Sequence, residues 1–346
     1  MLFKILNLFP SGVINKLYFW FIFVVYKFTG KALYPRKIII DPSNFCNLAC
    51  PLCANGSGSM RAEKSFMKIE LFEKILKEIP TIKHISLFNW GESFLNPQIN
   101  KMIEIAKEKG IHVSIHTNLS FKKTDKFWEE MIKAGPDEIE TSLDGTTQAV
   151  YQKYRKNGEL KLILNNLRKI VEIKNKLGKN KPRIFWKFMV NKFNEEQIEA
   201  AREKAEELGI DFEITTMEIG DENPDIILSG SIKERIEKWL PNNKEYLRSQ
   251  YLGKYEKPLF NRKCDQLFTT LAISPTGKVL PCCWAANDDN SFGDISREKF
   301  ENIWNNEKYQ YARNLFIGKV INKKADVICN KCSNFKQDKK LSKKLI

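Results

Sequence analysis

The strongest constraint on the fold is an alternation of strand-like and helix-like segments between residues 38 and 222. Short runs rich in β-branched residues occur at 37–41, 84–88, 111–117, 138–143, 183–190 and 210–217. Segments with an amphipathic helical period separate them, at 69–79, 97–110, 124–135, 160–178 and 194–209. Strands that alternate with helices form a parallel sheet with right-handed crossovers. We therefore expect an α/β protein with a partial, TIM-like (β/α)6 barrel and an active site at the carboxyl ends of its strands.

The pattern changes after residue 222, which indicates further domains. Residues 223–258 read as a helical connector, and residues 259–335 as a small cysteine-rich α+β domain. In that domain "LFTTLAISPTGKVLPCCW" predicts two short strands joined at Pro275-Thr276-Gly277, and a helix is expected after it. A chain of 346 residues is long enough for a barrel with such an appendage. A basic tail, 336–346, ends the chain.

Residues 1–37 form a basic and apolar N-terminal segment without any acidic residue. Within its apolar stretch, Leu17 to Phe28, the uninterrupted core from Leu17 to Tyr26 is flanked by Lys16 and Lys27 and is too short to span a bilayer. Such a segment either lies in a membrane interface or packs as a helix on the domain that follows. Both alternatives remain open, so a cytoplasmic protein is expected, with peripheral contact to the inner membrane face as one option.

The net charge of +15 and the eight cysteines narrow the function classes. Lysine and arginine are interspersed with acids along most of the chain, which indicates solvated helix faces, and no RNA-binding module is recognisable, so no nucleic acid partner is expected. The cysteines are clustered and no cleavable secretory signal precedes them. Clustered cysteines in such a chain are more often metal ligands than disulfides.

Three cysteines, Cys46, Cys50 and Cys53, follow the first predicted strand with the spacing C-x3-C-x2-C. Thiolates are soft ligands that suit iron–sulfur clusters and zinc. A cubane cluster is normally held by four thiolates, so three leave one iron open to a small molecule. The spacing therefore predicts a cluster that touches a substrate or cosubstrate.

This arrangement resembles the radical S-adenosylmethionine (radical SAM) enzymes. In that family SAM chelates the open iron of a [4Fe–4S] cluster, and its reductive cleavage gives a 5′-deoxyadenosyl radical that abstracts a hydrogen atom. "LFNWGES" resembles the family's G-G-E motif, with Trp90 where glycine is usual, and "SIHTNLS" and "TSLDG" end the next two strands. The resemblance implies that SAM is bound by Leu52, Glu92, Thr117, Asn118, Ser142, Asp144 and Arg155.

A second cysteine group lies in the C-terminal domain and resembles the auxiliary-cluster domains called SPASM and twitch. The resemblance implies a second [4Fe–4S] cluster held by Cys264, Cys282, Cys329 and Cys332. The adjacent Cys283 is expected to be a bystander or to replace Cys282. Zinc at the same four cysteines is the alternative.

The spacing of these four cysteines is close to that of an aminocyclitol dehydrogenase of the radical SAM family. The expected function is therefore hydrogen abstraction from a small hydroxylated substrate, such as a sugar or cyclitol, with electron transfer to the auxiliary cluster. A reduced flavodoxin or ferredoxin is the implied electron donor. Lys187 is a conceivable base, and the three histidines are expected to be satisfied core residues.

Three alternative functions compete with this one. A peptide or protein maturase of the SPASM type is the main alternative, since many auxiliary-cluster enzymes modify peptides. A non-catalytic two-cluster electron carrier is disfavoured by the ordered SAM motifs. A zinc-stabilised RNA-binding protein is disfavoured by the lack of a recognisable module.

Overall fold

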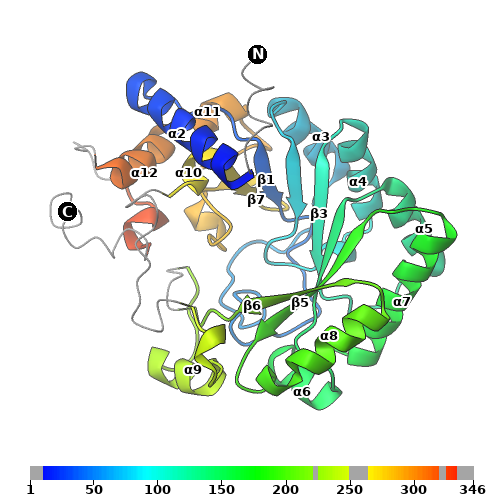
Figure 1. Cartoon of the computed structure of the whole chain (residues 1–346). Helices are drawn as coiled ribbons and strands as arrows, with labels where there is room; N and C mark the ends of the chain where they lie inside the picture. The colour runs from blue at the N-terminus through cyan, green and yellow to red at the C-terminus, as the bar shows by residue number, and fades with distance from the viewer. Residues whose placement is uncertain (1–10, 221–224, 249–263, 319–324, 333–346) are drawn as a thin grey trace.

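The computed structural model describes residues 11–220, 225–248, 264–318 and 325–332, with side chains from residue 20 onward. Its centre is one sheet with the strand order β6-β5-β4-β3-β2-β1-β7-β8-β9 (Figure 1). The first six strands are parallel to one another and follow in chain order across the sheet. They are β1 (Lys37–Ile40), β2 (His84–Leu87), β3 (His112–Thr117), β4 (Glu138–Ser142), β5 (Arg183–Val190) and β6 (Asp211–Thr216). The expected α/β fold with a partial barrel is thereby confirmed.

Helices lie along the outside of this sheet, as Figure 1 shows. They connect successive strands and are α3 (Ile69–Glu78), α4 (Ile99–Glu108), α5 (Asp125–Ala134), α6 (Gln148–Tyr154), α7 (Leu160–Lys176) and α8 (Ile198–Glu207). Helix α5 illustrates how the sequence sets the boundaries, since the Thr124 side chain accepts a hydrogen bond from the backbone of Phe127. Gly135 ends the same helix in the left-handed conformation that glycine adopts without strain.

The two faces of the barrel strands differ sharply in chemistry. The side chains that face the helices are apolar and fully buried, for example Ile85, Val113 and Ile139. The alternate positions of β2, β3 and β4 face the concave side of the sheet and are mostly polar, namely His84, Ser86, His112, Ser114, His116, Glu138, Glu140 and Ser142. The expectation that the three histidines are core residues is therefore wrong, because all three are only partly buried on the polar face.

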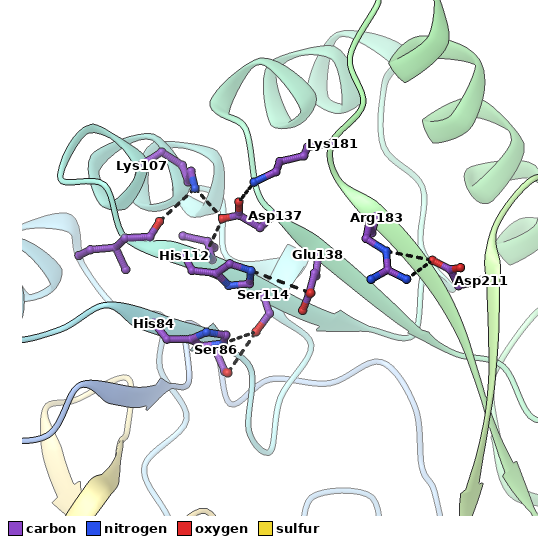
Figure 2. Close-up of polar contacts among 12 residues, drawn as sticks. His84, Ser86, Lys107, His112, Ser114, Asp137, Glu138, Lys181, Arg183 and Asp211 are labelled. Carbon is purple, nitrogen blue, oxygen red and sulfur yellow. Dashed lines mark hydrogen bonds and ion pairs between the residues drawn. The ribbon is translucent and has the colours of Figure 1, made fainter. Parts of the chain in front are cut away.

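The amino ends of the strands carry a polar network of their own (Figure 2). The rings of His84 and His112 stack with their centroids 4.4 Å apart, and Ser114 donates a hydrogen bond to Ser86 over 3.1 Å. Nearby, the Asp137 carboxylate accepts hydrogen bonds from Lys107, Lys181 and the backbone of Val113. These contacts tie α4, β3 and the loop before β5 together at the end of the barrel opposite the cysteine loop.

The C-terminal hairpin continues the barrel sheet instead of starting a separate one. Strands β7 (Thr270–Ile273) and β8 (Lys278–Leu280) are antiparallel, as expected, but β7 also pairs in parallel with β1. Strand β9 (Gly293–Asp294) completes the sheet. In the described residues after β6 the helices are α9 (Ile232–Trp239), α10 (Gln266–Thr269), α11 (Phe300–Trp304) and α12 (Glu307–Ile317). Short 3-10 turns occur at Ser93–Leu95, Glu195–Gln197, Lys244–Tyr246, Asp288–Asn290 and Ile328–Lys331.

One helix was expected after the hairpin, and the structure has two. Helix α11 ends at Trp304, and the Asn306 side chain accepts a hydrogen bond from the backbone of Tyr309 to begin α12. An asparagine that caps a new helix competes with continuation of the old one. The expected tail 336–346 and much of the expected connector, 249–258, lie outside the described residues.

Helix α2 (Ser11–Thr29) packs on the C-terminal helices, beside α11 and α12 in Figure 1. Tyr26 is buried, donates to the Asn314 side chain over 3.0 Å and contacts the ring of Phe268 edge-on. The opposite side of the helix leaves Trp20 and Phe28 exposed. Within the described part of the chain, no helix combines the length and apolar character needed to cross a membrane.

Candidate active site

The three N-terminal cysteines lie in one loop directly after β1. Cys50 is buried, and Cys46 and Cys53 pack against the same apolar cluster, which includes Leu48 and Leu52. The loop folds back on itself so closely that a Cβ atom on Gly56 would lie 2.3 Å from the backbone nitrogen of Cys50. Glycine is therefore required where the loop returns past its second cysteine.

Two hydrogen-bond donors reach the sulfurs of this loop. The Asn118 amide is 3.8 Å from the Cys46 sulfur, and the Arg155 guanidinium is 3.9 Å from the Cys50 sulfur. Burial raises the pKa of the Cys46 thiol to about 12 and that of the Cys50 thiol to about 11, although Arg155 opposes the second shift. Metal ligation requires that these thiols lose their protons. A bound metal, together with the donors from Asn118 and Arg155, would then stabilise the negative charge of the thiolates.

The loop after β2 approaches the cysteine loop through Gly91. A Cβ atom at this position would lie 1.6 Å from the carbonyl oxygen of Ser43, so no other residue fits without movement of the backbone. The preceding Trp90 donates its backbone N–H to the Asp41 carboxylate over 3.1 Å and its indole N–H to the Ala285 carbonyl over 3.2 Å. Trp90 in place of a glycine is thus compatible with the close approach, and its ring connects the barrel to the C-terminal domain.

Glu92 is buried at the carboxyl ends of β2 and β3. Its carboxylate accepts hydrogen bonds from the Thr117 hydroxyl, the Asn118 backbone and the Phe94 backbone, over 2.7, 2.7 and 3.1 Å. Burial raises the pKa of Glu92 to about 7, and the hydrogen bonds from Asn118 and Thr117 only partly oppose this shift. Because burial disfavours the charged form of this carboxyl group, a cation or a further hydrogen-bond donor beside it would stabilise the carboxylate.

Arg155 links the cysteine loop to the end of β4. Its Nε donates to the fully buried Asp144 carboxylate over 2.5 Å, while its Nη1 faces Cys50. Asp144 is itself fixed by the Met189 backbone, which donates to its other oxygen over 2.8 Å. Ser142, at the end of β4, lies on the concave face that leads to this group.

A cavity of about 270 Å³ opens between the cysteine loop and the C-terminal domain. Leu52 lines one side of it and Trp284, two residues after Cys282, lines another. The remaining lining residues come from the loop after β2, from the end of α6, from the carboxyl ends of β5 and β6 and from the segment after β6. They are Trp90, Tyr154, Met189, Thr216, Glu218, Gly220 and Ile226. This position, at the carboxyl ends of the strands, is where parallel barrels bind their ligands.

The four expected C-terminal ligands line a second, smaller pocket of about 130 Å³. Its wall contains Cys264, Cys282, Cys329 and Cys332, whereas Cys283 lies off this wall and faces the Gln266 side chain at 3.8 Å. Burial raises the pKa of each of the first three thiols, and charge interactions among the same cysteines add to the shift. In the described residues no three or more histidine, cysteine or acidic side chains form a compact single-ion site.

Two buried donors behind the wall of this pocket have no partner among the described residues. They are the Tyr309 hydroxyl and the Nη2 atom of Arg313. Buried polar groups are normally hydrogen-bonded, so both fit an acceptor outside the described part of the chain. Tyr309 lies within electrostatic range of Cys282 and Cys329, so a cluster held by these cysteines is a candidate acceptor for its hydroxyl.

Sequence reasoning missed several residues that shape the site. Trp284 and Tyr154 line the cavity, and Asn47 exchanges hydrogen bonds with the segment after β3 through Asn118 and Ser120. Asn194 precedes α8 without capping it, and its amide donates to the carbonyls of Asp144 and Met189. No short motif signals such contacts, because they join loops that are distant in sequence.

Comparisons with known proteins agree with this architecture. Residues 40–179 match the model of the radical SAM superfamily, and residues 264–333 match SPASM, an iron–sulfur cluster-binding domain. The chain is 24% identical over 305 residues to the tungsten-containing aldehyde ferredoxin oxidoreductase cofactor-modifying protein of Pyrococcus furiosus. That alignment covers 80% of this chain and 83% of the relative.

Solved structures share the fold at low sequence identity. SuiB from Streptococcus suis, bound to S-adenosylmethionine, is 17% identical with a TM-score of 0.63, over 90% of this chain and 74% of that one. The protein anSMEcpe with bound AdoMet is 17% identical with a TM-score of 0.58, over 87% of both chains. The two matched families imply a [4Fe–4S] cluster with SAM and additional iron–sulfur in the C-terminal domain, as the sequence predicted. The chain is a radical SAM enzyme, a member of the radical SAM superfamily with a SPASM domain after its barrel.

Proposed function

We propose that this radical SAM enzyme oxidises a small hydroxylated molecule in the cavity between its two cysteine groups. The observation that carries the proposal is the shared wall of this cavity, with Leu52 beside Cys53 on one side and Trp284 near Cys282 on the other. A substrate held there lies between a group that starts radical chemistry and a group that accepts an electron. Two such groups around one cavity are what an oxidation by two electrons requires.

The N-terminal cysteines and the loops after β2 to β4 supply the SAM site in this proposal. Cys46, Cys50 and Cys53 would hold the cluster, and SAM would supply radical chemistry when bound to it. The buried Glu92 carboxylate would accept a hydrogen bond from the amine of SAM, since burial raises its pKa and a donor or cation beside it favours its charged form. The residues that position the rest of SAM are Leu52, Thr117, Asn118, Ser142, Asp144 and Arg155.

In this proposal the polar concave face supplies further substrate contacts from strands that lead to the cavity, although its charged residues are not among those that line the cavity. His116 lies 3.2 Å from the Glu140 carboxylate and stacks on Phe88, and Lys187 reaches both Glu140 and Glu213 at 3.1 and 2.6 Å. Burial alone would lower the pKa of Lys187, but Glu213 and Glu140 raise it, so Lys187 stays a cation and is a poor base. Burial would raise the pKa of Glu140, but His116 and Lys187 lower it to about 2, so Glu140 is also a poor base. Lys187 therefore binds hydroxyl oxygens, and the His116 imidazole is the candidate proton acceptor in this proposal.

A small substrate is favoured over a peptide by two facts. The cavity of about 270 Å³ is near the lower end of the volumes of small-molecule sites. The relative from Pyrococcus furiosus is named as a cofactor-modifying protein, which also indicates a small-molecule class. A peptide maturase remains the competing proposal, because SuiB, which has a similar fold, has been solved with its precursor peptide SuiA.

The C-terminal cysteines are the electron acceptor in this proposal. Cys264, Cys282, Cys329 and Cys332 line one pocket, and four thiolates leave a cluster without an open iron. The net charge of +15 favours an acidic electron-donor protein such as a flavodoxin or ferredoxin. In this proposal the positive charge of the enzyme attracts the acidic electron-donor protein.

The proposal is tested by counting iron and following deuterium. Anaerobically reconstituted protein is expected to hold about eight irons, and the Cys46/Cys50/Cys53→Ala variant about four. Carbon-deuterated sugars and cyclitols are then compared with deuterated peptides as donors to 5′-deoxyadenosine. Deuterium transfer from a polyol, with a carbonyl product, supports the proposal. Transfer from a peptide alone, or four irons that fall to none, overturns it.

A further inference from the structure

Arg313, on helix α12, is a fully buried cation whose acceptors are all neutral. Its Nε donates to the carbonyl of Leu267 over 2.8 Å. Its Nη1 donates to the Trp304 carbonyl over 2.7 Å and to the Asn305 side-chain oxygen over 3.0 Å. Its Nη2 is buried and has no hydrogen-bond partner among the residues that the structure describes. Carbonyl and amide oxygens satisfy some of the donors but leave the positive charge uncompensated.

No carboxylate in the described part of the chain pairs with this guanidinium; the ionisable groups that act on it are Tyr309 and Tyr26. Four aromatic rings surround it, with centroids 4.4 to 5.8 Å away, from Tyr26, Phe268, Trp304 and Tyr309. Cation–π contacts offset part of the cost of burial. A buried charge nevertheless remains unfavourable unless an anion lies near it.

The guanidinium lies behind the wall of the cysteine-lined pocket. Leu267, whose carbonyl accepts from Nε, lines that pocket, and so does Phe316, which follows Arg313 by three residues on α12. Tyr309, one turn before Arg313, interacts electrostatically with Cys282 and Cys329 on one side and with Arg313 on the other. The Tyr309 side chain is therefore within electrostatic range of both the sulfurs and the guanidinium, and its hydroxyl and the Nη2 atom both lack a partner in the described part of the chain.

We propose that Arg313 is the resident counter-charge of the iron–sulfur cluster held by Cys264, Cys282, Cys329 and Cys332. The inference rests on the ligand assignment in the proposed function. A cluster with four thiolates is a net anion, and each electron that it accepts adds negative charge. A cation buried beside it is screened little by solvent and favours the reduced form. Arg313 thereby raises the reduction potential of the electron acceptor.

A purely structural role is the competing explanation, because Arg313 joins α10, α11 and α12 by hydrogen bonds. The structural role and the counter-charge role can be told apart by a variant that neutralises the charge of Arg313 but keeps the arginine side chain. Asn305→Asp places a carboxylate at the atom that already lies 3.0 Å from Nη1. The new ion pair neutralises Arg313 in place and preserves its contacts, so the variant is expected to fold.

The experiment measures the midpoint potential of the C-terminal cluster by redox titration monitored by electron paramagnetic resonance. The full chain carries Cys46/Cys50/Cys53→Ala, so that the remaining iron belongs to the C-terminal site. Asn305→Asp, Arg313→Gln and Arg313→Lys are compared in this background. Lys308→Met is the matched control, since it removes one positive charge from the same helix at an exposed position.

Asn305→Asp and Arg313→Gln are expected to shift the midpoint to more negative potential, whereas Arg313→Lys and Lys308→Met leave it close to the parent. An unchanged midpoint in Asn305→Asp, with four irons bound, overturns the counter-charge role even if the arginine variants do not fold. Absence of iron from the parent overturns the cluster assignment as well, so the iron content tells the two failures apart.

Discussion

The guanidinium of Arg155 joins the buried Asp144 carboxylate to the sulfur of Cys50, at 2.5 and 3.9 Å. One side chain thus connects the end of β4 to the cysteine loop after β1. Hydrogen bonds to ligand sulfurs and nearby charges set the potentials of iron–sulfur clusters. Arg155 is therefore placed to affect the first cluster through its hydrogen bond to a ligand sulfur, whereas its charge, unlike that of Arg313, is paired with a carboxylate.

Arg155→Met is expected to shift the midpoint potential of the N-terminal cluster to a more negative value and to slow SAM cleavage. The reason is the loss of both a positive charge and a donor next to Cys50. The measurement is a redox titration of the cluster, with the rate of 5′-deoxyadenosine formation under dithionite as a second readout. Arg168→Met, on the exposed side of α7, is the control. An unchanged potential would show that Arg155 only positions Asp144.

The amino end of the barrel gives a prediction about stability and pH. Burial would raise the pKa of Asp137, but hydrogen bonds from Lys107, Lys181 and the Val113 backbone lower it to about 2 (Figure 2). A carboxyl whose pKa is lowered on folding stabilises the protein above its unfolded pKa of 3.8, and this contribution is lost as the pH falls through 2.

Asp137→Asn is therefore expected to lower the free energy of unfolding by about 1–2 kcal/mol at pH 7, after allowance for the solvent around Lys181. The deficit should shrink below pH 4 and vanish near pH 2, as measured by urea unfolding across this range. Glu138→Gln, the next residue, is the control for loss of a charge at the same end. A deficit that stays constant with pH would mean that packing, and not ionisation, is responsible.

The barrel and its cysteines could be predicted because they are local patterns. Period-2 and period-3.6 apolar spacing marks β1 to β6 and their helices, and Cys46, Cys50 and Cys53 lie within eight residues. The alternation of polar and apolar residues in "HVSIHT" also indicates the polar concave face. The sequence alone does not say whether its histidines are buried in the core or face the open side of the sheet, because that depends on the curvature of the sheet.

Long-range packing could not be predicted in the same way. The pairing of β7 with β1 makes the second domain an extension of the barrel sheet, and no local signal specifies a partner more than 200 residues away. The roles of Arg313 and Asn194 likewise depend on which carbonyl groups the fold brings near them. Burial of a charge is a property of the whole structure, so a sequence pattern alone does not reveal it.

The exposed side of α2 gives a prediction about membrane contact. Trp20, Phe21 and Phe28 are more than half exposed beside Lys27 and Lys31, whereas Tyr26 anchors the opposite side to the protein. Aromatic side chains next to lysines bind the interface of anionic bilayers. The enzyme is therefore expected to cosediment with vesicles that contain phosphatidylglycerol, and less with pure phosphatidylcholine.

The matched variant for this test is Trp20→Ser/Phe28→Ser, which should reduce cosedimentation several-fold and leave iron content and SAM cleavage unchanged. Ile227→Ser removes an exposed apolar side chain elsewhere on the molecule and serves as the control. Equal sedimentation of all three proteins would argue that this side of α2 faces another protein or water.

Glu92 gives the sharpest test of the SAM site. Burial raises its pKa to about 7, so below that pH the free carboxyl holds a proton that must leave before it can accept a hydrogen bond from the SAM amine. Affinity for SAM is therefore expected to fall by up to about tenfold for each pH unit below 7. Glu92→Gln should bind SAM weakly at every pH. Calorimetry at pH 6 in buffers of different ionisation enthalpy should show that this variant releases close to one proton fewer than the wild type. Equal proton release by the two proteins would show that the Glu92 carboxylate does not contact SAM, and the SAM amine would then need another partner on this face of the barrel.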